Sequence, residues 1–222
     1  TSILVKPLAW VIVKVGLLVK NYGVSIILLG ILLRLLVLPL SKQTMDMSTN
    51  MQKANPELQR LEKKYNGRTD QQSLMAKQQE MLMIYKKYDI KPFSGCLVSL
   101  IQLPLFFAFL EAIQRIPAIL EEKLLGFDLG TTPWKAISNG QYYYIIIVIL
   151  IGLSTYFSFK NTGSMSVSKE QEAQTKMMTR MMTVFITLMS FSLNVGIGVY
   201  WFSTSAFAIL QNIILKLSLI HI

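Results

Sequence analysis

Long apolar runs separated by polar loops make up most of the chain. A helix of about 20 residues crosses the ~30 Å hydrocarbon core of a bilayer, and five runs approach or reach that length. The fourth is short, so we expect it to use its polar first turn or to lie where the bilayer is thinned. The pattern predicts an all-α polytopic membrane protein with five transmembrane helices. The runs are residues 23–40, 94–113, 141–159, 177–193 and 196–217.

The segment before the first run, residues 1–22, has a mixed character. Lys6, Lys14 and Lys20 interrupt its apolar residues, and Trp10 is a side chain suited to the membrane interface. We expect an amphipathic helix lying on the membrane surface. A sixth span is the alternative, and three lysines in a short run oppose it.

The polar segment 41–92 contains two stretches with helical 4-3 spacing of apolar residues. Asn66-Gly67 between them resembles a helix C-cap, and Thr69 or Asp70 can cap the next helix. We expect an antiparallel helical hairpin in which Pro56 bends the first helix or restarts it. The seam positions are Met47, Met51, Ala54, Leu58, Leu61 and Tyr65, then Leu74, Gln78, Met81, Tyr85 and Tyr88.

Methionine is frequent in this segment. On the seams its simplest role is to pack the hairpin together. Met45 and Met83 lie off the seams, and flexible thioethers suit surfaces that meet varied apolar partners. These two residues are therefore candidates for partner recruitment.

Basic residues are concentrated in two of the loops. Of 22 Lys and Arg, ten lie in 41–92 and four in 160–180, while the loop 114–140 has three. By the positive-inside rule the two basic loops are cytoplasmic, the N-terminus is outside and the C-terminus is inside. No stacking aromatics are interleaved with the basic run, so the net charge of +10 fits anionic headgroups and not sequence-specific nucleic acid.

Arg34 lies in an apolar run without an acidic residue. Burying such a cation costs roughly 2.5–3.5 kcal/mol on insertion scales. Glu111 lies at a depth that differs by ~15 Å in straight helices, which excludes an ion pair. We expect Arg34 to face a polar inner-leaflet site, the alternative being snorkelling to the headgroups.

Hydroxyl and amide side chains on other predicted spans can line such a site. Many of them can equally be ordinary interhelical hydrogen-bonding groups. The candidates are Ser99, Gln102, Thr183, Thr187 and Ser203, with Ser190, Thr204, Gln211 and Asn212 as further members.

Several motifs resemble one family in order and spacing. Asn21–Ile27, Arg34 and Pro39–Ser41 resemble the first core span of the YidC/Oxa/Alb family of membrane protein insertases and chaperones. The remaining matches are Lys91–Cys96 with Leu100–Phe106, and Tyr200-Trp201. The similarity covers a single five-span core over residues 1–222 of the shorter Gram-positive type, although Asn194-Val195 stands where many relatives have proline.

The resemblance implies an insertase in the bacterial plasma membrane that guides nascent hydrophobic segments through a hydrophilic, positively charged groove around Arg34. It implies no covalent catalysis, no cofactor and no metal. The implied partners are nascent membrane proteins, the ribosome, the Sec translocon and the signal-recognition machinery. The implied substrate slide is Leu103, Phe106, Tyr200 and Trp201.

Two other classes of function fit the residues less well. A transporter or anion channel would use Arg34 as its binding site, but we find no inverted repeat. An intramembrane enzyme is opposed by the lack of HExxH and GxSxG motifs and of a histidine partner for Cys96.

Both ends of the chain carry expectations of their own. Residues 217–222 match what a transposon-based sequencing adapter encodes in frame, so we expect them to be non-native and a basic ribosome-binding tail to be missing. Thr1 is not an initiator Met, which suggests that a leader segment has been removed.

Overall fold

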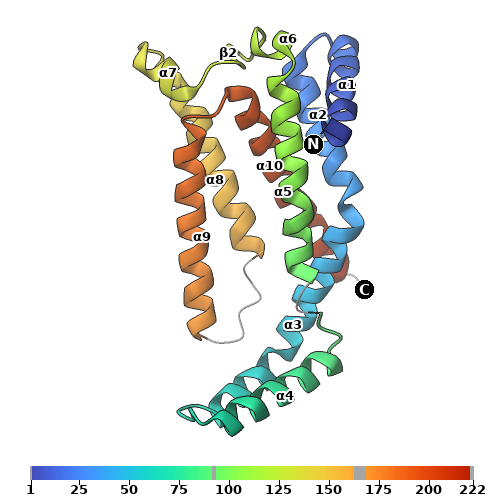
Figure 1. The fold of residues 1–222 in the computed structure, drawn as a ribbon, viewed down its shortest axis with the longest axis vertical. Coiled ribbons are helices and arrows are strands. Elements are labelled where there is room, and N and C mark those ends of the chain that lie inside the picture. The colour runs from blue at the N-terminus through green and yellow to red at the C-terminus, as the bar shows by residue number, and fades with distance from the viewer. Residues whose placement is uncertain (1, 92–93, 163–168, 221–222) are drawn as a thin grey trace.

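The computed structural model describes residues 2–91, 94–162 and 169–220, with side chains over 4–91, 104–160 and 173–214 (Figure 1). The predicted helical class is confirmed, because the one sheet is a pair of two-residue strands. The helices of the first half are α1 (Ser2–Val19), α2 (Tyr22–Leu36), α3 (Leu38–Lys64), α4 (Gln71–Lys87) and α5 (Ser94–Gln114). There follow α6 (Pro117–Leu120), β1 (Lys123–Leu124), β2 (Phe127–Asp128), α7 (Pro133–Ser138), the 3-10 turn η1 (Tyr142–Tyr144), α8 (Ile145–Thr162), α9 (Lys169–Ser190) and α10 (Val195–Ile220).

The long helices form one bundle in which α10 has a central position. α10 packs against α2 and α8, α9 packs against α8, and α1 packs against α2 and α5 (Figure 1). We call the end of the bundle that carries α6, α7 and the strands the loop end, and the end that carries α3 and α4 the hairpin end. The charge pattern predicts that the loop end is outside the cell and the hairpin end is cytoplasmic.

Within the described residues, two segments are long and apolar enough to cross a bilayer unaided, Tyr142–Lys160 and Val195–Ile214. α2 and α3 reach span length together, and the described apolar part of α5, Pro104–Gln114, is shorter than a span. The predicted runs therefore correspond to helices, while the number of five spans stays a prediction.

The first predicted span, residues 23–40, is not one straight helix. α2 ends at Leu36, α3 starts at Leu38, and the two are bent by 57°. The cause is Pro39, which has no N–H to donate and whose ring crowds the carbonyl of Leu35. Pro56 does not end or restart the helix, since α3 continues through it from Leu38 to Lys64.

The apolar core is densest at the loop end. The side chains of Phe109, Ile113, Ile119, Leu129 and Tyr144 are all 0% exposed. Backbone hydrogen bonds tie the outer loop to the start of α10, from Val195 N to Thr131 O and from Gly196 N to Leu129 O, both at 2.9 Å. This end of the bundle is therefore closed by packed side chains.

The predicted helical hairpin is present as α3 and α4. Every residue of the first predicted seam is buried, with exposures from 0% for Ala54 to 9% for Tyr65. In the second seam Met81, Tyr85 and Tyr88 pack against this cluster. The prediction is wrong for Leu74, which is 49% exposed, and for Gln78, which is also exposed.

The register of the two helices explains that difference. Each of the two helices carries one glutamate that binds a Lys-Tyr pair at the end of the other helix. Glu80 accepts from Lys64 and, at 2.9 Å, from the Tyr65 hydroxyl. Glu57 accepts from Lys87 and, at 2.9 Å, from the Tyr88 hydroxyl. In this antiparallel register the end of α3 is level with Glu80, so Leu74 lies six residues, or about 9 Å along α4, beyond that contact.

The helix caps within the hairpin agree with the sequence. Gly67 has a φ of +78°, the left-handed conformation that follows a helix end. Asp70 is the residue that caps α4, with its carboxylate accepting from Ser73 N at 2.9 Å. Hydrogen bonds from the side chain and the backbone N–H of Ser73 lower the pKa of the Asp70 carboxyl.

Acidification should loosen the hairpin. Hydrogen bonds from Lys87 and Tyr88, and from Lys64 and Tyr65, hold the pKa of the Glu57 and Glu80 carboxyls below the usual 4.5. A carboxyl with a lowered pKa stabilises the folded state above its unfolded pKa, and this contribution is lost as the pH falls through the lowered value. Spin labels at exposed Gln59 and Lys86 should therefore give a broader distance distribution at pH 3 than at pH 7.

The double variant Glu57→Gln/Glu80→Gln should be broad at both pH values. Glu62→Gln is the matched control, because Glu62 makes only a 3.7 Å pair with Lys77. A distribution in the wild type that stays equally narrow at pH 3 would contradict the role of these two carboxylates.

Candidate functional site

Arg34 lies in the last turn of α2. The residue is half-buried, and its Nε is fully buried without a hydrogen-bond partner among the described residues. A buried donor without an acceptor is unfavourable by about 1–3 kcal/mol, and by more for a charged group. The cation predicted from the sequence thus lies at the hairpin end with at least one unsatisfied N–H.

Gly30, one turn before Arg34, lies at a close contact between α2 and α10. A Cβ atom at Gly30 would lie 3.0 Å from Thr204 Cγ2 and 3.3 Å from Tyr200 Cδ2, with Ser203 Oγ at 3.5 Å. Only glycine fits such a contact without displacing its neighbours. Since residues four apart share a helix face, Arg34 points toward the side of the bundle that α10 occupies.

The predicted polar residues do not all meet at Arg34. Ser203 is on the α10 side of the Gly30 contact, and its hydroxyl donates to Tyr200 O at 3.0 Å. On α9, Thr183 donates to Thr179 O and Thr187 donates to Thr183 O.

Thr187 lies against α8, since its Oγ1 is 2.9 Å from the Cβ position of Gly152. The structure therefore brings Ser203 to α2 and Thr187 to α8. The side chains of Ser99, Gln102 and Leu103 lie outside the described residues.

An aromatic cluster joins α5 to α10. The Phe106 ring meets Trp201 edge-on at 5.1 Å and is stacked on Tyr200 at 6.3 Å. Phe109, which the sequence reasoning did not select, stacks on Tyr200 at 3.9 Å. Three of the four predicted slide residues are thus neighbours. Tyr200 is buried, while Phe106 and Trp201 are half-buried.

A second residue that sequence reasoning missed is Thr155 on α8. Its Oγ1 accepts a hydrogen bond at 2.9 Å from Trp201 Nε1, and the residue is 1% exposed. The available signal was the Ser154-Thr155 pair in an otherwise apolar stretch. This bond fixes the indole orientation relative to α8.

On the hairpin, Met83 is 67% exposed and Met45 is half-buried. Met75 and Leu82 on α4 are also largely exposed, at 58% and 56%. Their exposure agrees with a contact surface, and the recruitment role of Met45 and Met83 stays a prediction.

Glu111 does not pair with Arg34. Its carboxylate instead binds the guanidinium of Arg115, one turn further along the chain. The absence of a pair with Arg34 agrees with the difference in depth predicted from the sequence. Within the described ranges, no group of three or more His, Cys, Asp or Glu side chains could hold a metal ion.

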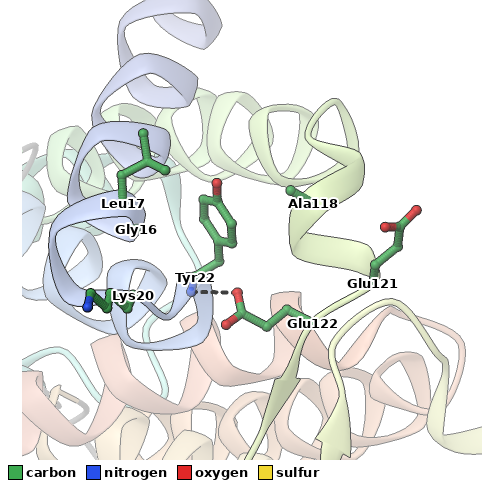
Figure 2. Close-up of a pocket in the computed structure, with 7 residues that line it drawn as sticks. All are labelled: Gly16, Leu17, Lys20, Tyr22, Ala118, Glu121 and Glu122. Carbon is green, nitrogen blue, oxygen red and sulfur yellow. Dashed lines mark hydrogen bonds between the residues drawn. The ribbon is translucent and has the colours of Figure 1, made fainter.

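A cavity of about 440 Å³ lies at the loop end, between the α1–α2 corner and α6 (Figure 2). One of its walls is Glu122, whose carboxylate accepts from Tyr22 N at 2.7 Å, while Asn21 Oδ1 accepts from Val24 N at 2.9 Å. Both bonds satisfy free N–H groups at the start of α2. The cavity is at the opposite end of α2 from Arg34, so it is not the predicted polar site. Its wall residue Glu122 anchors the start of that helix.

Comparison with known proteins agrees with this architecture. The sequence model of the 60Kd inner membrane protein family matches residues 14–220. The chain belongs to this family. It is 35% identical over 213 residues to the membrane protein insertase MisCA of Bacillus subtilis strain 168, covering 96% of this chain and 77% of the relative. Membrane protein insertase YidC of Oceanobacillus iheyensis is 31% identical over 220 residues, covering 97% and 82%.

A solved structure supports membership of the 60Kd inner membrane protein family. The crystal structure of an active YidC insertase with its first transmembrane domain resolved superposes with a TM-score of 0.67 at 25% sequence identity. The match covers 93% of this chain and 44% of the solved one, so this chain spans less than half of that protein. The family predicted from the motifs is therefore confirmed.

Replacing Thr155 by Val should destabilise the α8–α10 contact, because the Trp201 indole N–H would lose its acceptor in an apolar setting. Interhelical hydrogen bonds in membranes contribute about 0.6–1.7 kcal/mol, so we expect a loss of that order in unfolding experiments in detergent. Thr155→Ser keeps the hydroxyl and should retain most of the stability. Equal stability of the Val variant and the wild type would show that the bond does not hold the two helices.

Proposed function

We propose that this chain is a membrane protein insertase that guides nascent hydrophobic segments into the bilayer through a hydrophilic, positively charged site at Arg34. The observation that carries the proposal is the buried, unsatisfied Arg34 Nε at the hairpin end of a bundle whose loop end is packed shut. The relatives named above are membrane protein insertases, which supports the same activity here.

The two ends of the bundle support a one-sided path. Apolar packing around Ile113, Ile119 and Tyr144 leaves these side chains without solvent contact at the loop end. A charge at the hairpin end attracts water and anionic groups into the inner leaflet, which shortens the apolar distance that a polar segment has to cross. The client's own span supplies the driving force, at about −0.3 to −0.6 kcal/mol for each Leu-like residue.

The buried Nε favours this reading of Arg34 over snorkelling, in which the whole guanidinium reaches the headgroups. Ser203 lies one turn from Arg34 on the facing helix, and Gln102 and Ser99 remain candidates from the sequence. Thr183 and Thr187 are weaker members of the site, since their hydroxyls bond within α9 and Thr187 faces α8.

Phe106, Tyr200 and Trp201, with Leu103, are proposed as the apolar slide along which the client leaves for lipid. Half-burial of Phe106 and Trp201 leaves ring surface available for such contact. The exposed thioether of Met83, together with Met45, is proposed to recruit nascent chains, the ribosome or the Sec and signal-recognition machinery at the cytoplasmic hairpin.

The proposed location is the bacterial plasma membrane, with the N-terminus outside and the C-terminus in the cytoplasm, because the basic residues gather at the hairpin end. Insertion of this kind needs no covalent step, so the proposed activity is not enzymatic.

Arg34→Ala should weaken insertion of clients that carry an acidic residue in the translocated segment, by about tenfold if one charge-assisted contact is lost. Arg34→Lys should retain most of the activity, since it keeps the cation. The measurement is protease protection of a small single-span client in liposomes that contain the purified chain.

Lys42→Ala is the matched control, because it removes an exposed charge just beyond the bend. Equal insertion by Arg34→Ala and wild type would rule out the groove-charge mechanism. No protected client above empty liposomes, combined with flux of a small anion, would favour the transporter class instead.

A further inference from the structure

Gln211 on α10 shares an unusual property with Arg34. Among the described residues, two buried side-chain nitrogen or oxygen atoms lack a hydrogen-bond partner, and they are Arg34 Nε and Gln211 Nε2. Gln211 is 6% exposed, so its amide is not satisfied by bulk solvent. Both atoms are donors, and each lies on one of the two helices that meet at Gly30.

The helix geometry brings these donors to similar depth. α2 and α10 run in the same direction, from the loop end toward the hairpin end (Figure 1), and Gly30 is level with Thr204. Arg34 is four residues beyond Gly30 and Gln211 is seven beyond Thr204, which gives about 6 Å and about 10 Å along the axes. An offset of about 4–5 Å is within the reach of an arginine side chain.

Both side chains also lie on the facing surfaces. Thr204, Ala208 and Gln211 follow the 4-3 spacing of one helix face, and all three are buried, at 5%, 8% and 6% exposure. Thr204 contacts the Gly30 position directly. Because Arg34 is one turn from Gly30 on α2, the two unsatisfied donors flank the same stretch of the α2–α10 contact.

The chemistry required of a ligand follows from these two groups. A guanidinium and a neutral amide N–H together need an acceptor that carries negative charge and has more than one lone pair. A carboxylate has two oxygens and forms short, charge-assisted bonds with such donors. In α2, α5, α8 and α10, Glu111 is the only acidic residue, and it is bound to Arg115.

We propose that Gln211 is a second donor of the Arg34 site, and that the two residues together bind one side-chain carboxylate of the translocating segment. This proposal rests on the insertase function proposed above. Arg34 supplies the charge, and Gln211 supplies a directed hydrogen bond that separates an ionised carboxylate from its uncharged amide isostere. Gln211 is thus a specificity-determining residue for acidic clients.

The test uses the full chain in liposomes and two clients that differ only by Asp or Asn at one position of the translocated segment. Wild type should insert the Asp client in preference to the Asn client. Gln211→Met keeps the side-chain length and removes the amide, so it should lower the Asp-to-Asn ratio by about tenfold, with the larger loss in the Asp client.

Gln211→Glu provides an independent variant, because it places a carboxylate of the chain itself beside Arg34. It should abolish or invert the preference for the Asp client. Leu210→Met is the matched control, since it makes a change to Met at the neighbouring residue, which is 51% exposed and outside the buried face of Thr204 and Gln211; its ratio should equal that of wild type.

The possible results separate the hypotheses. An unchanged ratio in Gln211→Met, or an equal loss of both clients that indicates a structural role only, would overturn the proposal for Gln211. Failure of wild type to insert even the Asn client would instead contradict the proposed insertase function.

Discussion

The close approach of α2 to α10 at Gly30 is the contact on which the candidate site depends. With any larger residue at position 30, a Cβ atom would press against Thr204 and Tyr200, and these side chains would have to shift by a few tenths of an ångström. A shift of Tyr200 would disturb its stacking on Phe109. The absent side chain at Gly30 therefore links the α2–α10 contact beside Arg34 to the packing of the aromatic cluster.

Short hydroxyl side chains and long polar side chains differ in how they are satisfied inside the apolar helices. Thr183, Thr187, Ser203 and Thr204 donate to carbonyls of their own helices, so their hydroxyls are satisfied without water or a ligand. Longer side chains cannot fold back in this way. Arg34 and Gln211 retain unsatisfied donors for that reason, and the number of hydroxyls along a span says little about a polar cavity.

Local patterns predicted the features that depend on local spacing. The seam from Met47 to Tyr65 repeats at helical spacing, and all of its members are buried. Leu74 and Gln78 were assigned wrongly because their burial depends on where α3 ends relative to α4, which is fixed by Glu57 and Glu80 across the hairpin. Glu122 accepts a hydrogen bond from Tyr22 at the start of α2, 100 residues away in sequence, and Thr155 accepts one from Trp201, 46 residues away. No periodicity within one helix reports such contacts.

The bend at Val37 allows a movement of the hairpin to be coupled to a movement of Arg34. α3 has 27 residues and is about 40 Å long, whereas Arg34 is three residues, or about 4–5 Å, from the bend. If the two helices turn as rigid arms about this pivot, a swing of about 9 Å at the hairpin tip corresponds to about 1 Å at the arginine. A small displacement of the buried cation and a large displacement of the exposed tip would then result from the same rotation. The hydrogen bond from Tyr22 N to Glu122 ties the far end of α2 to the outer loop and opposes this rotation.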